Sequence, residues 1–302
     1  MADLAVTAKR VRGRGAETRS GWAFVTPFLI VFVVAIVAPV GYAIYLSLYR
    51  DQLVGGNSFV GLTNYVQVLS DPQFWGGLGR VAIFLAVQVP VMLFLALFAA
   101  LALDSGRLHA SRFFRIVLFL PYAVPGVVAV LIWGFIFGPK YGLTGSINSG
   151  LGFTLFDPLS PHWILTSIGN ITTWEFVGYN MLIFYSALRT VPTELYEAAS
   201  IDGAGVFRTI LSVKIPALRG ALVIATVFSI IGSFQLFNEP NLLKPLAPNS
   251  ISSSFTPNLY AFYLSFSGQQ YNYSATIAIV MGIITGVIAY VVQLRGTRRD
   301  AR

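Results

Sequence analysis

The chain has 302 residues, of which 56% are hydrophobic and 11% are charged, against about 25% charged residues in soluble domains. A water-soluble fold of this size cannot bury so much apolar surface, which excludes a soluble enzyme, and the high hydrophobicity excludes a disordered chain. The absence of cysteine excludes disulfides, Cys-based zinc sites and a thiol nucleophile. The net charge of +8 indicates a partner only once the positions of the basic residues are known.

Six stretches are long and apolar enough to be membrane helices, each of which needs about 20 largely apolar residues. They are residues 22–48, 81–103, 116–137, 164–188, 221–237 and 273–294. Prolines interrupt the first stretch and the third, and we expect kinks there, because neighbouring helices absorb prolines in a membrane bundle. The basic start of the chain could belong to a signal peptide. The apolar run that follows exceeds the about 7–15 residues of a signal core, which favours an uncleaved first helix.

The basic residues orient these spans. With the N-terminus in the cytoplasm, sixteen of the twenty lysines and arginines lie on the cytoplasmic side, and the other four are Arg50, Arg80, Lys140 and Lys244. This bias predicts a multi-pass membrane protein with both termini in the cytoplasm, and it accounts for the charge without nucleic acid. The predicted segments are a basic tail (1–20), a first transmembrane helix (21–50), a core (51–295) with a cytoplasmic loop at 189–219, and a second cytoplasmic tail (296–302).

Motifs of catalysis are absent from the sequence. It has no Gly-rich loop followed by Lys and Ser or Thr, so it lacks the phosphate cradle of a P-loop ATPase. It has no Gly-x-Ser-x-Gly elbow and no His-Glu-x-x-His pair. His109 and His162 fall on opposite sides of the membrane in the predicted topology. We therefore predict no catalytic residue, no metal site and no cofactor on this chain.

The loop at 189–219 has the pattern of two short helices. Pro192 suits a first helical turn, and Glu194 and Glu197 complement the helix dipole behind it. Gly203 can end that helix in a left-handed conformation, after which a second helix over about 204–213 leads to Pro216. On physical grounds alone, this segment is either an amphipathic connector or a contact surface for another protein.

Particular residues favour the contact surface. The loop contains Glu197-Ala198-Ala199, then Gly203 after three residues, then Val213-Lys214-Ile215-Pro216. This pattern resembles the EAA loop of ABC importer permeases, and Asp202-Gly203-Ala204 is typical of the sugar-importing branch. The resemblance extends over residues 22–295, and Gly178-Tyr179-Asn180-Met181 is similar to the F-type subunit of maltose-type importers. One departure is Arg80-Val81, where these relatives usually have Asn-Thr.

The resemblance implies a fold and a set of partners. The fold would be an all-α integral membrane protein with six transmembrane helices and a cytoplasmic EAA coupling-helix loop, the ABC type I importer permease fold. The partners would be a G-type second permease, two copies of a cytoplasmic ATPase that bind ATP and Mg, an extracellular or periplasmic sugar-binding protein, and the lipid of a bacterial or archaeal cell membrane. The chain itself would be a transporter subunit and not an enzyme. The ATPase-coupling residues would be Glu197, Ala198, Ala199, Asp202, Gly203 and Pro216.

Polar residues within the spans are candidates for a substrate pathway, since lipid would reject them. Thr172, Glu175 and Tyr179 fall on one face of the fourth span, and a second stripe on the fifth consists of Thr226, Ser229 and Ser233. Glu175 is the only acid deep within a predicted span, and an intramembrane carboxylate is a functional-site hypothesis by default. For the serines and threonines, hydrogen bonds across helices or back to their own helical turn are an equal alternative. The predicted pathway set is Thr172, Trp174, Glu175, Tyr179, Asn180, Ser229, Ser233 and Gln235.

The charge of the substrate is predicted separately. No basic residue lies within a span interior, which favours a neutral di- or oligosaccharide over an anionic substrate such as a glycerol phosphate. A second hypothesis is a self-sufficient secondary carrier that uses Glu175 as its proton site. The two hypotheses differ in energy source, since only the first needs an ATPase.

Overall fold

The computed structural model describes residues 14–52, 56–106 and 108–300. These residues are helical apart from one antiparallel hairpin, in which β1 (Tyr49–Gln52) pairs with β2 (Gly56–Phe59). The rings of Tyr49 and Phe59 lie opposite each other, with centroids 5.4 Å apart. The predicted helical membrane protein is confirmed at this level, and the short hairpin is an addition to it. Of the basic tail predicted at 1–20, residues 1–13 lie outside the described residues.

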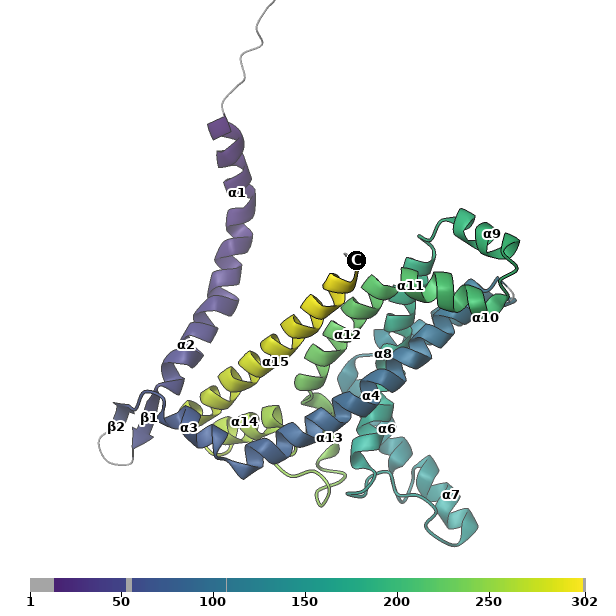
Figure 1. Cartoon of the computed structure of the whole chain (residues 1–302). Coiled ribbons are helices and arrows are strands. Elements are labelled where there is room, and N and C mark those ends of the chain that lie inside the picture. The colour runs from purple at the N-terminus through teal and green to yellow at the C-terminus, as the bar shows by residue number, and fades with distance from the viewer. Residues whose placement is uncertain (1–13, 53–55, 107, 301–302) are drawn as a thin grey trace, which may run out of the picture.

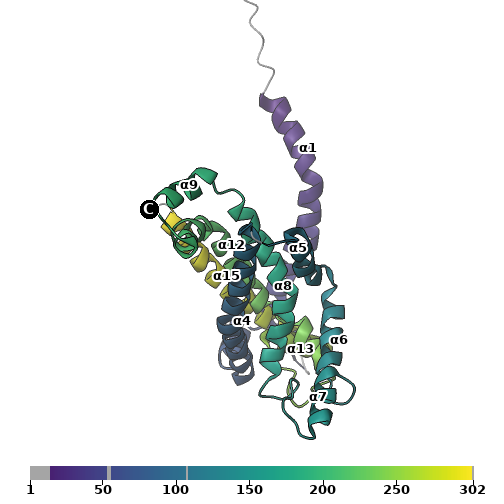
Figure 2. The same ribbon diagram turned by 90° about the vertical axis from the view of Figure 1, so that its right-hand side faces the viewer.

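The first span is a single rod that stands apart from the other helices. It consists of α1 (Arg14–Phe32), the π-helical turn η1 (Val33–Val37) and α2 (Ala38–Ser47). The π-helical turn lies just before Pro39, whose ring nitrogen cannot donate the usual helix hydrogen bond. The rod rises away from the bundle in both views (Figures 1 and 2), and its large apolar side chains, such as Phe24 and Phe28, are exposed. Only its α2 end packs on the bundle, against α15 (Tyr271–Asp300).

The second span begins earlier than the sequence predicts. After α3 (Thr63–Leu69), helix α4 extends over Pro72–Asp104, although apolarity predicts a start at residue 81. The start is set by Asp71, whose side chain accepts a hydrogen bond of 2.8 Å from the backbone N–H of Gln73, and by Pro72 in the first turn. This first part of the helix was not predicted as part of the span, because glycines and polar residues between 73 and 80 lower its hydropathy.

The outer end of α4 is tied to the C-terminal part of the chain. Asp71 accepts hydrogen bonds from the hydroxyls of Tyr260, at 2.9 Å, and Tyr273, at 2.7 Å. Burial and the bond to Asp71 raise the pKa of Tyr260 to about 12. Arg80 donates to the carbonyl oxygens of Ser254 and Phe255 and lies 5.3 Å from the Phe255 ring centre. The unusual arginine thus fastens α4 to the loop before α14 (Pro257–Phe266).

The third predicted span is broken. Its residues form α5 (Ser111–Phe119), a 3-10 turn η2 (Leu120–Ala123) and α6 (Gly126–Phe137), and the two halves are bent by 97°. A proline forces the residue before it out of the helical region, and Val124, which precedes Pro125, has an extended ψ of 130°. The expected kink is therefore a full break, and α7 (Leu143–Leu151) follows it at the molecular edge.

Helices α4 and α8 (Ile164–Leu188) form the centre of the bundle. The bounds of α8 coincide with the predicted ones. Ala96 and Ala100 of α4 are fully buried in one apolar cluster with Met181 and Phe184 of α8, and such small residues allow close approach of two helices. Gly178 lets α8 pass directly against α5, since a Cβ there would lie 1.9 Å from the Leu118 carbonyl oxygen.

The loop after α8 contains the two predicted short helices. They are α9 (Thr193–Ile201) and α10 (Val206–Thr209), followed by a π-helical turn η3 (Ile210–Lys214), α11 (Ile215–Ala217) and α12 (Arg219–Phe234). Gly203 follows α9 with a φ of +71°, the left-handed conformation in which glycine is favoured. Figures 1 and 2 show α9, the start of α1 and the end of α15 at one end of the molecule, with α7 and α13 (Asn238–Leu243) at the other.

Four helical stretches of the described chain are long and apolar enough to cross a membrane. They are Gly21–Ser47, Pro72–Asp104, Arg219–Leu243 and Tyr271–Gly296, and the bent pair α5–α6 makes a fifth if it counts as one span. Helix α8 is 25 residues long but is not one of the four. Polar residues along it, such as Asn170, Glu175 and Asn180, lower its hydropathy.

Candidate functional site

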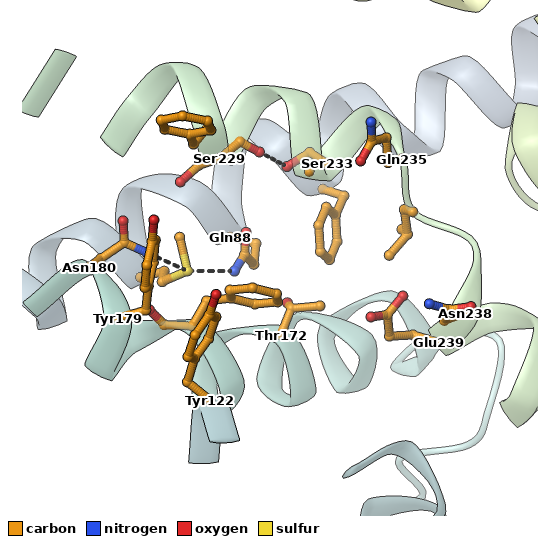
Figure 3. Close-up of a pocket in the computed structure, with 16 residues that line it drawn as sticks. Gln88, Tyr122, Thr172, Tyr179, Asn180, Ser229, Ser233, Gln235, Asn238 and Glu239 are labelled. Carbon is orange, nitrogen blue, oxygen red and sulfur yellow. Dashed lines mark hydrogen bonds between the residues drawn. The ribbon is translucent and has the colours of Figure 1, made fainter. Parts of the chain in front are cut away.

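A cavity of about 360 Å³ lies between α4, α8 and α12 (Figure 3). Helix α4 contributes one face to it and α8 a second, while α12 and the start of α13 close the third side, and η2 reaches in with a single tyrosine. The described residues that line it are Phe84, Gln88, Met92, Tyr122, Thr172, Phe176, Tyr179, Asn180, Phe228, Ser229, Gly232, Ser233, Gln235, Leu236, Asn238 and Glu239.

Two side-chain amides at the cavity, those of Gln88 and Asn180, both contact the sulfur of Met92. Gln88 donates to Thr173 Oγ1 at 3.3 Å and to the sulfur of Met92 at 3.4 Å, and Asn180 donates to the Phe176 carbonyl at 3.0 Å. Asn180 also faces the Met92 sulfur at 3.8 Å. Both amides are buried. Their carbonyl oxygens accept no hydrogen bond from another described residue, so they are available to a hydroxyl donor in the cavity.

Hydroxyl groups on α8 and α12 differ in their partners. Thr172 donates to the carbonyl oxygens of Ile168 and Gly169, and Ser233 donates to the Ser229 carbonyl at 2.8 Å. These are bonds of a side chain to its own helix. The Ser229 hydroxyl lines the cavity and makes no hydrogen bond to another described residue.

An aromatic wall closes one side of the cavity. The ring of Tyr122 on η2 stacks on that of Tyr179 on α8, with centroids 4.7 Å apart, and lies edge-on to Phe176 at 5.9 Å. The broken third span makes this possible, because the turn at Leu120–Ala123 brings Tyr122 beside α8. Flat aromatic faces and hydroxyl-binding amides together suit a polyhydroxylated ring with apolar C–H faces.

The charge at the cavity is acidic. Glu239, on α13, is the one ionisable carboxyl among the described lining residues, which include no lysine, arginine or histidine. Figure 3 shows it beside Asn238 and across from Ser233. The sequence predicts that the fifth span ends at residue 237, before Asn238 and Glu239. That boundary is corrected, because Glu239 falls within the apolar helical stretch Arg219–Leu243.

Six of the eight predicted pathway residues line this cavity, namely Thr172, Tyr179, Asn180, Ser229, Ser233 and Gln235. Trp174 and Glu175 do not. Trp174 lies instead against Trp133 of α6, with ring centroids 5.9 Å apart. Glu175 is buried, and its Oε1 lies 3.3 Å from the position of a Cβ at Gly126. Since successive helix residues turn by about 100°, the cavity-facing side of α8 contains Thr172, Phe176 and Tyr179 and leaves Glu175 beside it.

Sequence reasoning missed part of the lining. Gln88 is a polar residue in the middle of the second predicted span, which is a signal that could have found it. Asn238 and Glu239 were missed because the end of the fifth span was placed at residue 237. Tyr122 carries no such signal, since its position depends on the break at η2.

The loop that holds the predicted coupling residues is open to its surroundings. Glu197, Ala198, Asp202 and Gly203 are exposed, Ala199 and Pro216 are half-buried, and all lie at the end of the molecule away from α7 and α13. Large apolar side chains are exposed beside them, with Ile201 at 86% and Phe207 at 74% of their full accessibility.

Comparison with known proteins decides the family. The family of binding-protein-dependent transport system inner membrane components matches residues 92–299. The chain belongs to this family. The permease is therefore a multi-pass membrane component of a transport system, and the resemblance in its sequence is confirmed.

Relatives with assigned roles match nearly the whole permease. The lactose transport system permease protein LacF of Rhizobium radiobacter is 31% identical over 280 residues, covering 90% of this chain and 92% of the relative. The diacetylchitobiose uptake system permease protein NgcF of Streptomyces coelicolor is 32% identical over 290 residues, covering 90% of this chain and 80% of the relative.

A solved structure has the same fold. It is a chain from a bacterial ABC transporter involved in the import of the acidic polysaccharide alginate, with a TM-score of 0.81 over 94% of this chain and 96% of that chain. The sequence identity is 16%, so this likeness concerns the fold alone.

Proposed function

We propose that the permease forms half of a translocation pathway for a neutral di- or oligosaccharide, in an ABC importer that also contains a second permease, two ATPase subunits and an external sugar-binding protein. The observation that carries this proposal is the cavity between α4, α8 and α12, with its amides, free hydroxyl and stacked tyrosines. The names of the relatives, which concern lactose and diacetylchitobiose, support the same substrate class.

A neutral substrate is supported by the charge of the lining. A uronate or phosphate is bound most strongly by a cationic side chain, and the described lining offers a carboxyl group in place of a basic residue. The test is uptake by the reconstituted importer of neutral lactose against an acidic uronate oligosaccharide of similar size. Uptake of the neutral sugar alone supports the proposal, and uptake of the uronate alone contradicts it.

Coupling to the ATPase is proposed for the loop at 189–219. It is supported by the exposure of helix α9, which contains Glu197-Ala198-Ala199. The apolar side chains of Ile201 and Phe207 are also exposed, and they lie on a segment outside the candidate spans. Exposed apolar side chains next to the Glu197-Ala198-Ala199 helix are compatible with contact by another protein at this loop. ATP and Mg would be bound by that ATPase and not by this chain.

A variant tests the coupling role directly. Glu197→Ala, or Gly203→Pro, which forces a φ that glycine does not have here, should uncouple ATP hydrolysis from sugar uptake while membrane insertion stays normal. Both are compared with the parent complex in proteoliposomes. Undiminished uptake in both variants would contradict the proposed role of the loop.

The proposed topology has six membrane spans, with both termini in the cytoplasm of a bacterial or archaeal cell. This count adds the bent α5–α6 pair and the polar α8 to the four apolar stretches. A polar helix is tolerated in a membrane when its polar face lines a cavity, as that of α8 does. The basic residues of the loop and of the C-terminal end of α15 favour the cytoplasmic side for that end of the molecule.

The proton-coupled carrier remains the alternative. Its proton site was predicted at Glu175, which is buried but does not line the cavity. The two functions differ in energy source. Uptake that persists without an ATPase and stops when the proton gradient is dissipated would favour the carrier.

A further inference from the structure

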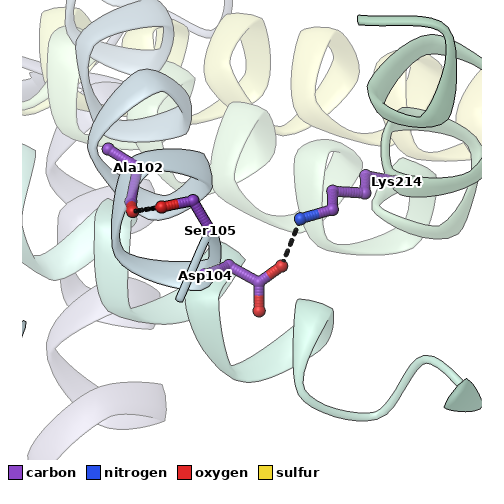
Figure 4. A network of polar contacts seen from close by, with 4 residues as sticks. All are labelled: Ala102, Asp104, Ser105 and Lys214. Atoms are coloured by element: carbon purple, nitrogen blue, oxygen red, sulfur yellow. Dashed lines mark hydrogen bonds and ion pairs between the residues drawn. The ribbon is translucent and has the colours of Figure 1, made fainter. Parts of the chain in front are cut away.

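One helix connects the cytoplasmic loop with the cavity. Helix α4 is continuous from Pro72 to Asp104, and at a rise of about 1.5 Å per residue it is long enough to cross the whole membrane. Gln88 and Met92 on α4 line the cavity, and Ala96 and Ala100, at four-residue spacing on the same side, are fully buried against α8. The last residue of the helix, Asp104, lies beside the loop (Figure 4).

The cytoplasmic end of α4 is held by an ion pair. Asp104 Oδ2 lies 2.5 Å from Lys214 Nζ on η3, and this is the one ion pair among the described residues. The side chains are 9% and 13% exposed, respectively. Removing one partner of a buried ion pair leaves an uncompensated charge, so such a pair holds its two elements together more firmly than a surface pair does.

The same lysine contacts the helix that contains the predicted coupling residues. Lys214 Nζ lies 5.5 Å from the ring centre of Tyr196, which belongs to α9 and directly precedes Glu197. The Tyr196 hydroxyl is buried and has no hydrogen-bond partner among the described residues. Burial raises the pKa of Tyr196, and the negative charge of Asp104 raises it further. A continuous set of contacts thus leads from α9 through Lys214 and Asp104 into α4.

We propose that the Asp104–Lys214 ion pair is a joint that stays closed during transport and makes α4 the element through which movement of the cytoplasmic loop reaches the cavity wall at Gln88 and Met92. Both residues are positioning residues, since neither touches the cavity. The proposal rests on the proposed ATPase coupling of the loop. It adds which element of this chain transmits the coupling.

The chain has no cysteine, which allows a direct test with one reporter thiol. Gln88→Cys is introduced into the permease, and the complete importer is labelled with a methanethiosulfonate reagent, without nucleotide and after trapping with ATP and vanadate. We expect the two labelling rates to differ by at least about fivefold, the lower end of typical coupling between sites. Equal rates would overturn the proposal, because α4 would then not respond to the nucleotide state.

The joint is then removed and restored. In Asp104→Ala/Lys214→Ala, which leaves no unpaired charge, the nucleotide response of the reporter should fall to about onefold, whereas the swapped pair Asp104→Lys/Lys214→Asp should restore it. A merely structural pair would affect assembly and not this ratio. Arg112→Gln, which removes an exposed charge on α5, is the matched control. A full response without the pair, or none in an assembled swapped variant, would overturn the proposal.

A second reporter separates this proposal from the proposed function. Ala198→Cys lies on the exposed face of α9, and its labelling should be blocked when the ATPase is bound. If Ala198→Cys is blocked and the Gln88→Cys response survives loss of the ion pair, only the joint is wrong. If Ala198→Cys stays open in the assembled complex, the coupling role of the loop itself is wrong.

Discussion

Ser229 and Ser233 stand one helical turn apart on α12, and their hydroxyl groups differ in what they bond. Ser233 donates to the Ser229 carbonyl, whereas the Ser229 hydroxyl faces the cavity without a hydrogen bond to another described residue. We predict that Ser229→Ala weakens sugar binding by about 0.5–1.5 kcal/mol, the net value of one hydrogen bond, and that Ser233→Ala weakens it less. The sugar dependence of uptake measures both. A larger effect of Ser233→Ala would contradict this assignment.

The two acids near the cavity should respond differently to the same substitution. Glu239 lines the cavity, and Glu175 is buried beside it without lining it. Glu239→Gln should lower sugar affinity by about 1 kcal/mol, because the amide keeps an acceptor oxygen and loses only the difference between a hydrogen bond to a charged group and one to a neutral group. Glu175→Gln should leave the affinity unchanged. The concentration of sugar at half-maximal uptake checks both, and a loss confined to Glu175→Gln would instead return that residue to the pathway.

Asp71 should make the outer end of the bundle sensitive to acid. Burial alone would raise its pKa, but hydrogen bonds from Tyr273, from the Gln73 N–H and from Tyr260 outweigh it and hold the pKa of Asp71 below its ordinary value of 3.8. A lowered folded-state pKa stabilises the fold above the unfolded pKa, and this contribution is lost as the pH falls through the folded pKa. In detergent, the melting temperature should fall below about pH 4 more steeply for the parent than for Asp71→Asn. Identical pH profiles would show that Asp71 contributes nothing of this kind.

Among the elements, the crossing of α5 and α8 depends on one glycine. A Cβ at Gly178 would lie 1.9 Å from the Leu118 carbonyl oxygen and 2.8 Å from the Phe119 Cα, and backbone atoms cannot give way as a side chain end can. Gly178→Ala should therefore destabilise the protein by at least about 1–3 kcal/mol, the usual cost of overpacking. Gly286→Ala, on α15 with open space around its Cβ position, is the matched control.

The stability measurement is thermal unfolding of the two variants in the same detergent. A clear fall in melting temperature for Gly178→Ala, with little change for Gly286→Ala, is the expected result. Equal melting temperatures would mean that α5 shifts away from α8 without cost. The bend at η2 would then be less fixed than the described packing indicates.

Apolarity and turn chemistry predict elements well only where one signal dominates. The bounds of α8 match the predicted stretch between two polar loops, although polar residues lower its hydropathy, and those of α9 follow from Pro192 and Gly203. The start of α4 was not predicted, because it is set by the cap at Asp71 and by hydrogen bonds from Tyr260 and Tyr273. These two residues lie 189 and 202 positions away from Asp71 in the sequence. The break between α5 and α6 was expected as a kink, since the number of prolines gives no bend angle.

The cavity shows the same limit. Residues on α8 and α12 were predicted from polarity at helical spacing, which identifies a face to within about one residue. Because of this uncertainty, Glu175 was assigned to the same face as Thr172 and Tyr179. Only the latter two line the cavity. Tyr122 on η2 enters the lining through tertiary packing, which no periodicity of a single segment contains, whereas Gln88 on α4 could have been found as a polar residue within a span.

At the scale of the whole molecule, the chain divides into a bundle and a separate first span. The rod α1–α2 leaves its apolar side chains exposed, while the bundle contains the cavity between α4, α8 and α12 and carries the open loop at α9 and α10. We propose that this membrane component works only in an assembly, in which the cavity determines sugar specificity and the loop at 189–219 transmits the energy of ATP hydrolysis.

The measurement that tests this claim most directly is purification of the permease in mild detergent together with the products of its native neighbouring genes. The stoichiometry of the complex is determined, and its ATP hydrolysis is measured with the binding protein and either neutral or uronate oligosaccharides. We predict a complex of two different permeases and two ATPase copies that a neutral sugar stimulates. A homo-oligomer without an ATPase, or a complex that only uronates stimulate, would contradict the claim.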